Sequence, residues 1–273
     1  MRDESVKITP LSKLVKVGHW NTAMLHSQPF DRLLWITRGQ GQMAFNAEMQ
    51  SYLPFSVTFL PAGTPHRFDI KPTVFGIAVD VAVHANLDMP KTAFSLRLRD
   101  VSEQRRFAQL IDTVQIELDR PKDPELMDLD DRALRYQAGL MGVWLERRAR
   151  TKSDHTALSP SARLVMRFLD FVETRLGQGD NIASLSALLD VTPTHLTRCC
   201  RKTLGQSALE LLNERLHHHA RMQLLRTSTP VKDIAASLGF ASAAYFTRAF
   251  QNLAQQTPSE FRAVHTRALA AAA

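Results

Sequence analysis

Two threonine–arginine pairs, 50 residues apart in the chain, are the side chains best suited to specific recognition. Thr197-Arg198 and Thr247-Arg248 stand at matching places in two similar stretches of sequence. An arginine can donate two hydrogen bonds to O6 and N7 of guanine in the DNA major groove, and a threonine can contact a base edge or a methyl group. Thr194 lies three residues before Thr197, on the same helix face. We therefore predict base contacts from these five residues, with solvated surface positions as the alternative interpretation.

Three further basic residues are suited to a different task. Arg201, Lys202 and Lys232 are predicted to contact phosphates, which position a protein on DNA and make its binding salt-dependent. The chain carries a net charge of +7. Residues 161–273 contribute 13 basic and 8 acidic side chains, a net of +5, whereas residues 1–160 contribute 21 and 19, a net of +2. The positive excess therefore lies mainly in the C-terminal part, as binding to a polyanion requires.

The cysteines and histidines do not form a pattern typical of a metal or redox centre. Cys199 and Cys200 are adjacent, no CxxC or Cys/His zinc spacing exists, and we expect this pair to pack in a core. The three histidines at 217–219 diverge by about 100° each on a helix, so they cannot converge on one ion, and we expect a solvated face or a minor phosphate contact. His66 lacks the HxH partner of a metal-binding barrel. We predict no catalytic residue, no metal site and no cofactor.

The elements that must position the recognition residues are helices. A helix over 160–176 begins with a capping serine followed by a proline, which suits the first helical position. Residues 185–205 and 234–255 each read as a short helix, a tight turn and a capped second helix, with one extra residue in the second turn. Residues 208–225 carry leucines at helical spacing and join the two units. The sequence predicts two helix-turn-helix units that can reach successive major grooves.

The N-terminal part predicts a β domain followed by two helices. Short apolar or β-branched runs separated by Gly, Pro and Asn turns favour a sandwich or barrel. The predicted strands are 33–37, 42–45, 57–60 and 74–83. Helices are predicted over 101–118 and 126–150, with prolines 121 and 124 between them. Their apolar stripes either pack on the β domain of the same chain or pair two chains, and the sequence leaves both open.

The second unit carries a family signature. It consists of Ile234-Ala235, Gly239-Phe240, Phe246, Arg248, Phe250, Thr257-Pro258 and Phe261-Arg262. This pattern resembles the C-terminal domain of AraC/XylS-type transcription regulators over about 100 residues. The chain departs from the family at Gln255, where a glycine is usual, and at Cys200, where a phenylalanine is usual. Ala243 and Ala244 replace residues that are often polar and contact DNA.

The N-terminal part is similar to the sensor half of the same family. The resemblance is carried by Leu34-Trp35-Ile36, by Gly39 and Gly41, and by the run from Leu60 to Phe68. It implies a cupin-like β-barrel that binds a small effector, followed by helices that dimerise. Trp35, Arg38 and His66 are the predicted lining of the effector pocket.

These observations predict an α+β chain of two domains. The expected boundaries are 1–98 for a cupin-like effector-sensing domain, 99–150 for dimerisation helices, 151–158 for a linker and 159–265 for a double helix-turn-helix domain. The expected function is a sequence-specific transcription regulator and not an enzyme. A cupin metalloenzyme with a helical appendage and a regulator whose barrel only dimerises are the alternatives.

The expected partners are double-stranded promoter DNA, a second copy of the chain and a small organic effector, with RNA polymerase as a further possibility. The first residues lack the apolar run of a signal peptide, and no stretch of about 18 apolar residues occurs. The sequence therefore predicts a cytoplasmic protein that does not interact with membranes.

Overall fold

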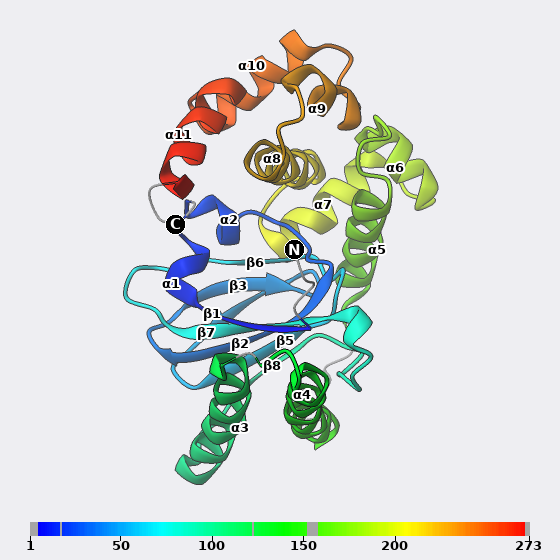
Figure 1. Cartoon of the computed structure of the whole chain (residues 1–273). Coiled ribbons are helices and arrows are strands. Elements are labelled where there is room, and N and C mark those ends of the chain that lie inside the picture. Colours follow the sequence, from blue (N-terminus) through cyan, green and yellow to red (C-terminus); the bar gives the residue numbers. More distant parts are fainter. Residues whose placement is uncertain (1–4, 17, 122, 152–157, 271–273) are drawn as a thin grey trace.

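The computed structural model describes residues 5–16, 18–121, 123–151 and 158–270. Two β-sheets form the N-terminal half. Helices α3 (Val101–Asp119) and α4 (Met127–Thr151) lie on one side of them, and the C-terminal helices lie on the other (Figure 1). The predicted linker 151–158 falls mostly outside the described residues. The coarse architecture predicted from the sequence, a β region followed by a helical domain, is confirmed.

The larger sheet has five antiparallel strands in the order β1-β7-β2-β5-β8. They are β1 (Val6–Pro10), β7 (Phe75–Ala82), β2 (Phe30–Arg38), β5 (Ser56–Leu60) and β8 (Phe94–Arg97). The smaller sheet has three strands in the order β4-β3-β6. They are β4 (Glu48–Tyr52), β3 (Gly41–Phe45) and β6 (His66–Phe68). Short helices α1 (Leu11–Leu14), α2 (Trp20–Ala23) and η1 (Val83–Ala85) complete this half.

The expectation of a closed barrel is corrected by this topology. Every strand pairing in the described part of the chain falls within one sheet or the other. A barrel needs hydrogen bonds that continue around the whole circumference. Here β3 pairs only with β4 and the three-residue β6, so the short sheet stacks on the long one as a sandwich. Four of the eight strands match the predicted runs, and the short or polar β1, β4, β6 and β8 were not predicted.

Strand β2 explains why the sandwich has two apolar layers. Leu33 and Trp35 face α3 and α4, whereas Leu34 and Ile36 face the smaller sheet. Successive side chains of a strand point to opposite faces, so a strand buried on both faces reads as a continuous apolar run. Trp35 packs edge-on against Phe107 of α3 with ring centroids 5.2 Å apart.

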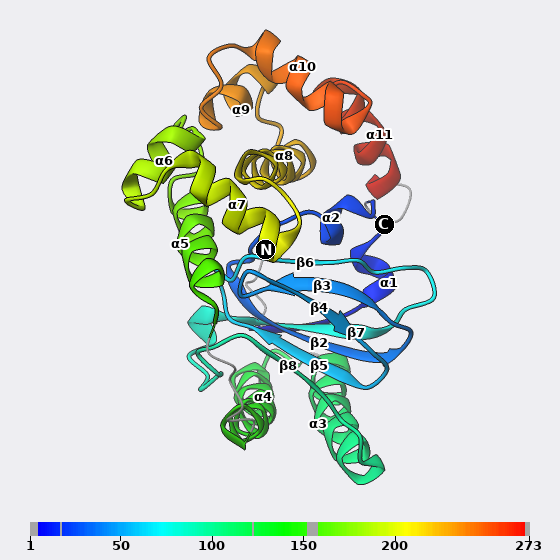
Figure 2. The same ribbon diagram turned by 180° about the vertical axis from the view of Figure 1, so that it is seen from behind.

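The C-terminal half consists of seven helices in the described residues. They are α5 (Pro160–Thr174), α6 (Ile182–Leu188), α7 (Pro193–Leu204), α8 (Ala208–Arg226), α9 (Val231–Ser237), α10 (Ala243–Ala254) and α11 (Pro258–Ala270). Seen from behind, α5, α6 and α7 form one group and α9, α10 and α11 another, with α8 between them (Figure 2). Each group has its own apolar core, and α8 contributes side chains to both.

The helix ends repeat with the 50-residue period. Thr192 and Ser242 cap α7 and α10 through their side-chain oxygens, which accept the backbone N–H three residues on. Ser207 forms a capping box with Glu210 at the start of α8, and Thr257 makes the same hydrogen bonds with Glu260 before α11. The internal repeat therefore extends from the recognition helices to the helices that follow them.

The two recognition helices end in the same left-handed conformation on different residues. Gly205 follows α7 with φ +74° and Gln255 follows α10 with φ 58°. A side chain costs about 1–2 kcal/mol in this region, where glycine is unstrained. The glycine that is usual at position 255 in AraC/XylS-type sequences thus has a conformational reason. Gln255 adopts the same left-handed conformation at a cost in folding free energy.

We predict that Gln255→Gly raises the stability of the C-terminal domain by about 0.5–1 kcal/mol because it removes this strain. Gly205→Ala is the matched opposite change and should lower stability by about 1 kcal/mol. No atom lies within 4 Å of a Cβ built at Gly205, so the cost comes from the backbone alone. Thermal unfolding of the full chain should show midpoint shifts of about 2–4 °C in opposite directions. Shifts of the same sign would contradict this account.

Candidate DNA-binding interface

Helix α7 presents a polar outer face over a buried inner one. Leu196, Cys200 and Leu204 are at most 3% exposed and pack in the core of the first unit. The opposite face carries four of the predicted contact residues. Pro193, Thr194, Thr197, Arg198 and Arg201 together line one shallow depression on the protein surface. The structure therefore brings Thr194, Thr197 and Arg198 together with the predicted phosphate contact Arg201.

His195 is a residue of this face that sequence reasoning missed. Its Nδ1 lies 2.8 Å from the guanidinium Nη2 of Arg198, and its Nε2 lies 3.7 Å from Sγ of Cys199. A guanidinium only donates hydrogen bonds, so Nδ1 must be the acceptor and His195 must be neutral for this contact. His195 thereby holds the Arg198 side chain in place on the recognition face. The signal in the sequence was the spacing of three residues, which places both side chains on one helix face.

Helix α10 presents a less polar face. Phe246 and Phe250 are buried, and Arg248 is exposed on the outside. Thr247 donates its hydroxyl hydrogen to the Ala243 carbonyl at 2.8 Å, and this contact engages the side chain within its own helix. Tyr245, which is 56% exposed, is a further side chain on this helix that the sequence analysis did not single out. The second unit therefore offers Arg248 and Tyr245 as its larger exposed polar side chains.

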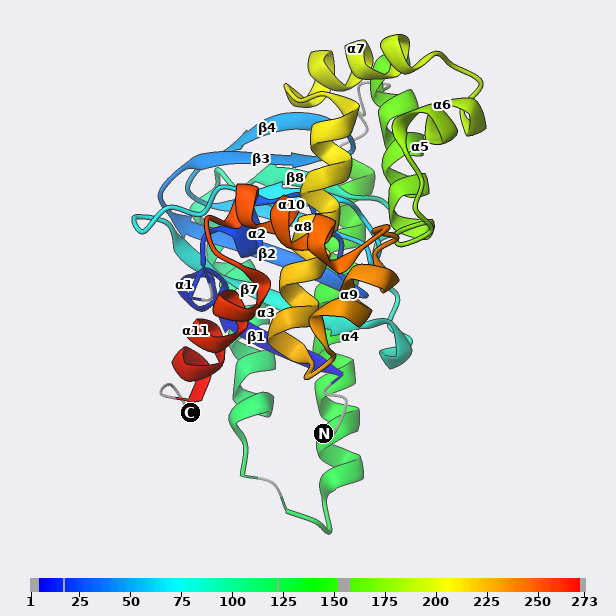
Figure 3. The ribbon, with the colours of Figure 1, turned by 90° about the horizontal axis from the view of Figure 1, so that it is seen from above.

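The two units are held close together by backbone contact as well as by α8. A Cβ built on Gly239, in the turn before α10, would lie 2.5 Å from the backbone nitrogen of Gly179, in the loop before α6. Only glycine permits this approach. Viewed from above, α8 runs on from the end of α7, and α10 lies across it (Figure 3). Lys202 on α7 and Lys232 on α9 are both exposed, as phosphate contacts would require.

Known proteins match the same part of the chain. A family model described as a helix-turn-helix domain matches residues 185–263. Residues 185–263 are a helix-turn-helix domain. The HTH-type transcriptional regulator GlxA of Rhizobium meliloti is 32% identical over 98 residues, which cover 36% of this chain and 30% of GlxA. An uncharacterized HTH-type transcriptional regulator of Staphylococcus aureus is 31% identical over 98 residues, which span only 13% of its length.

Two solved structures also align with the chain. The C-terminal domain of AraT, a response regulator from Geobacillus stearothermophilus, aligns with 40% of this chain and 88% of its own, with 29% identity and a TM-score of 0.37. Wild-type ToxT from Vibrio cholerae, solved with bound unsaturated fatty acid, aligns with 96% of this chain and 97% of its own, with 13% identity and a TM-score of 0.46. The predicted resemblance to AraC/XylS-type regulators is confirmed for the helix-turn-helix domain.

The cysteines of the helix-turn-helix domain both lie in its core. Cys199 is 5% exposed and Cys200 is fully buried, in agreement with the expected packing role. Burial raises the pKa of the Cys200 thiol to about 12. A thiol of this kind is protonated at neutral pH and is a poor nucleophile. Among the described residues, no group of three or more His, Cys, Asp or Glu side chains is arranged to hold a metal ion.

The expected solvated face at residues 217–219 is wrong. His217 and His218 are only 5% and 4% exposed. His217 stacks on Phe250 of the second unit, and His218 stacks on His26 of the β domain. Helix α8 is packed on several sides, so its polar residues contact other elements where an isolated helix would expose them to water.

No helix in the described part of the chain is long and apolar enough to span a membrane.

The three residues predicted to line an effector pocket lie apart. Trp35 is packed against Phe107 beneath the larger sheet. Arg38 lies over the ring of Phe75 where β2 ends and β7 begins, and His66 is buried beside His26 at the junction of the two domains. The structure does not bring these side chains to one cavity.

Proposed function

We propose that the protein is a sequence-specific DNA-binding transcription regulator of the AraC/XylS type. The observation that carries this proposal is the pair of recognition helices, α7 and α10, with matching caps on one rigid scaffold. Thr194, Thr197 and Arg198 would read bases from the first helix. Thr247 and Arg248 would do so from the second, and Arg201, Lys202 and Lys232 would contact phosphates. Such a regulator would act in the cytoplasm, and contact with RNA polymerase is compatible with this role.

The two units should contribute unequally to sequence recognition. The first presents Arg198, oriented by His195, together with two threonines. In the second, the Thr247 hydroxyl is already hydrogen-bonded within its own helix, and Ala243 and Ala244 offer no polar group. We infer that the first unit supplies most of the specificity and that the second relies more on phosphate contacts and DNA shape.

Selection of binding sites from a random duplex library with the full chain tests the proposal. At physiological salt we expect a defined site bound with a Kd on the order of 10⁻⁸ M or below. Arg198→Ala should weaken binding to that site by about tenfold to a hundredfold and relax the preference at one base pair. His195→Ala should give a smaller loss that disappears in the Arg198→Ala background, because it acts through Arg198. His195→Asn keeps an acceptor and should restore part of the affinity.

Lys202→Ala is the matched control on the same helix. It should weaken binding to all sequences alike and reduce the salt dependence by about one released counterion. Recovery of only weak, sequence-indifferent binding would contradict the proposed function. Unchanged affinity of Arg198→Ala for the selected site would remove that residue from the interface.

We propose further that two chains pair through α4. Leu129, Tyr136, Leu140 and Val143 are 44–69% exposed and recur at intervals of seven, four and three, which places them on one stripe of the helix. Ile116 of α3 is 66% exposed as well. The opposite side of α4 is already packed on the larger sheet. Monomeric proteins rarely expose a continuous apolar stripe of this kind, and a second copy would cover it symmetrically.

Leu140→Asp should weaken the dimer at least about tenfold, since it places a charge in an apolar contact. The fold should survive, because this side chain is 57% exposed in the single chain. Arg135→Glu, an exposed change on the same helix but off the stripe, is the control. Sedimentation velocity across a range of concentrations measures the dimerisation of the wild type and of the two variants. A wild-type chain that stays monomeric at micromolar concentrations would contradict the proposal.

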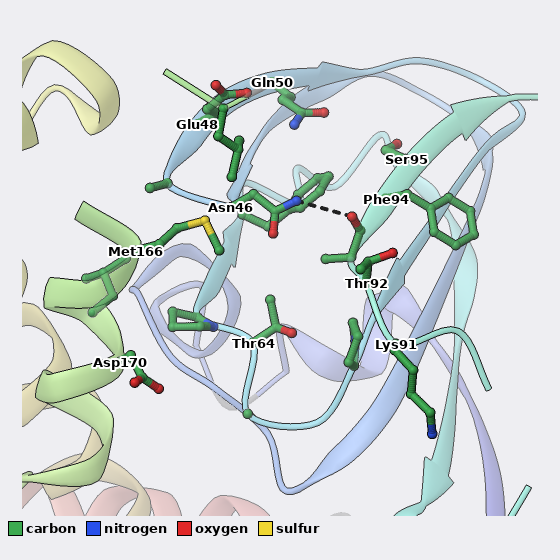
Figure 4. A pocket seen from close by; sticks show the side chains of 18 of the residues that line it. Asn46, Glu48, Gln50, Thr64, Lys91, Thr92, Phe94, Ser95, Met166 and Asp170 are labelled. Carbon is green, nitrogen blue, oxygen red and sulfur yellow. Dashed lines mark hydrogen bonds between the residues drawn. The ribbon is translucent and has the colours of Figure 1, made fainter. Parts of the chain in front are cut away.

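We also propose that a small organic effector binds between the β domain and α5. A cavity of about 870 Å³ lies there. Its lining consists of residues 45–48, 50, 61–65, 91–95, 158, 166, 167, 169 and 170. Its buried walls are apolar, with Phe45, Phe94 and Leu169 at most 4% exposed. Polar side chains surround it, and Asn46 donates a hydrogen bond to the Ala93 carbonyl across one side (Figure 4). An apolar floor with a polar rim suits a molecule with an apolar body and hydrogen-bonding ends.

A thermal-shift screen of metabolites against the full chain would identify such a molecule. At about 100 times its Kd, a ligand of the folded state adds about 2.7 kcal/mol of stability. Thr92→Trp fills the rim of the cavity and should reduce the shift, whereas Thr73→Trp, an equally exposed position away from it, should not. A compound that stabilises the wild type and Thr92→Trp equally would place the effector site elsewhere.

A further inference from the structure

Three histidine rings meet where the β domain contacts α8. His26 follows α2, His66 lies on β6 and His218 lies on α8. The rings of His26 and His218 are stacked with centroids 4.5 Å apart and an interplanar angle of 12°, and His66 lies 4.4 Å from His26. All three side chains are at most 4% exposed. We call these three residues the histidine stack. It joins the two domains, since β6 and α8 belong to different halves of the chain.

The hydrogen bonds of the stack suit neutral imidazoles. Nδ1 of His26 lies 2.8 Å from the Met24 carbonyl, and Nδ1 of His66 lies 2.8 Å from the Thr64 carbonyl. Nε2 of His218 lies 3.4 Å from the Asn21 carbonyl. A carbonyl only accepts, so each ring donates one N–H to it, and in a neutral ring the other nitrogen then carries a lone pair. Nε2 of His26 is buried and has no hydrogen-bond partner in the part of the chain that the structure describes, so a proton added there would find no acceptor among these residues.

The stack does not have the geometry of a metal site. The lone pair of an imidazole nitrogen lies in the plane of its ring. The nearly parallel rings of His26 and His218 therefore direct their lone pairs along their own planes and not toward a common point between them. The ring-to-ring contacts are those of packing, and this packing favours uncharged rings because two charged rings at these distances repel each other.

The charges around the stack also oppose protonation. Arg32 of β2 and Arg215 of α8 both act on His66, and each is paired with its own carboxylate, Asp80 and Glu173. Glu214 accepts hydrogen bonds from the Leu25 backbone N–H and from Gln206. The other charged or titratable side chains around the junction are His19, Arg67, Asp69, His217, His219, Arg221, Arg226 and His265. Among the described residues, no hydrogen bond joins a carboxylate to a ring of the stack.

Burial is the main cause of the resulting pKa values. It lowers the pKa of His66 and of His218 to about 3 and the pKa of His26 well below 6.5. The other two rings lower the pKa of His26 further, and Arg215 does the same for His218. The carbonyl acceptors act in the opposite direction but are outweighed.

We propose that the histidine stack is an acid-sensitive latch that holds the β domain on α8. The β domain has apolar cores of its own and the second helix-turn-helix unit has another, so the contacts at α8 can open without unfolding these cores. Leu25, Ala44 and Ala47 of the β domain pack into the core of the first unit and hold that side of the junction. Besides the stack, the junction is held by polar contacts, such as Ser27 with Glu173 and Arg67 with the Leu204 carbonyl, and by the packing of Trp20 on Phe261. Separation exposes the imidazoles to water, where they can bind protons. The latch contributes its stability above pH 6.5, the pKa of a free histidine, and loses it progressively as the pH falls below that value.

The size of the effect follows from proton linkage. A histidine that titrates at about 6.5 when free, and stays neutral when buried, multiplies the opening constant by about ten between pH 7.5 and pH 5.5. On opening, His218 separates from the other two rings. His26 and His66 remain neighbours on the β domain and repel each other when both are charged. We therefore expect opening to increase about tenfold to a hundredfold over this range.

Hydrogen exchange of the full chain, followed by mass spectrometry at pH 7.5, 6.5 and 5.5, measures this opening. After correction for the intrinsic pH dependence of exchange, protection of residues 18–27 and 208–224 should fall by this factor. Strands β2 and β5 should stay protected. His218→Phe and His26→Phe keep an aromatic ring without a titrating group, and each should remove about a tenfold part of the pH dependence. His84→Phe, an exposed histidine outside the stack, is the control.

Three results would overturn the proposal. They are protection in the wild type that does not change with pH, a change that both phenylalanine variants retain in full, and a simultaneous loss of protection in β2 and β5. A separate readout does not depend on any variant. Histidine Cε1 resonances of the wild-type chain should include three that do not titrate near pH 6.5 while the junction is closed. Ordinary titration of all three in the closed state would also refute the latch.

Discussion

The burial of helix α8 on several sides is the constraint on which the rest of the structure depends. Leu211 and Leu212 pack into the core of the first helix-turn-helix unit, and Ala220 and Leu224 pack into that of the second. A helix in this position has no wide solvated face, so its polar side chains must find partners inside the protein. Arg215 does so by pairing with Glu173 of α5.

The same constraint connects the β domain to the DNA-binding half. Arg221 of α8 lies over the rings of Trp20, Phe250 and Phe261, which come from both halves of the chain. On the β-domain side it thus lies over the Trp20 ring and donates to Sδ of Met24, and a guanidinium tolerates such partners because it is weakly hydrated and planar. Contacts of α8 with both halves give a signal in one domain a physical route to the other. The proposed effector cavity lies beside α5, the helix whose Glu173 neutralises Arg215.

The two recognition helices share a scaffold but not a chemistry. Their caps repeat at 192 and 242, because every helix of this kind must satisfy the same free N–H groups. Their outer faces are free of that requirement and have diverged, as His195 and Arg198 show against Tyr245 and Arg248. The residues that repeat between the two units are thus those that stabilise the helices, and the residues that differ determine what each helix can recognise.

Local features of the sequence were sufficient to predict the helices and the 50-residue repeat. They also predicted the outward position of Arg198 and the core position of Cys200. Capping residues, turn glycines and apolar periodicity act within a few residues and can be interpreted without the fold. The closed barrel and the solvated histidines at 217–219 were wrong because they depend on long-range partners. Only the tertiary structure decided that β3 pairs with β6, that Trp35 and His66 lie apart, and that His218 meets His26. Sequence periodicity shows that a residue faces a neighbour, but it does not identify that neighbour when the contact spans almost 200 residues.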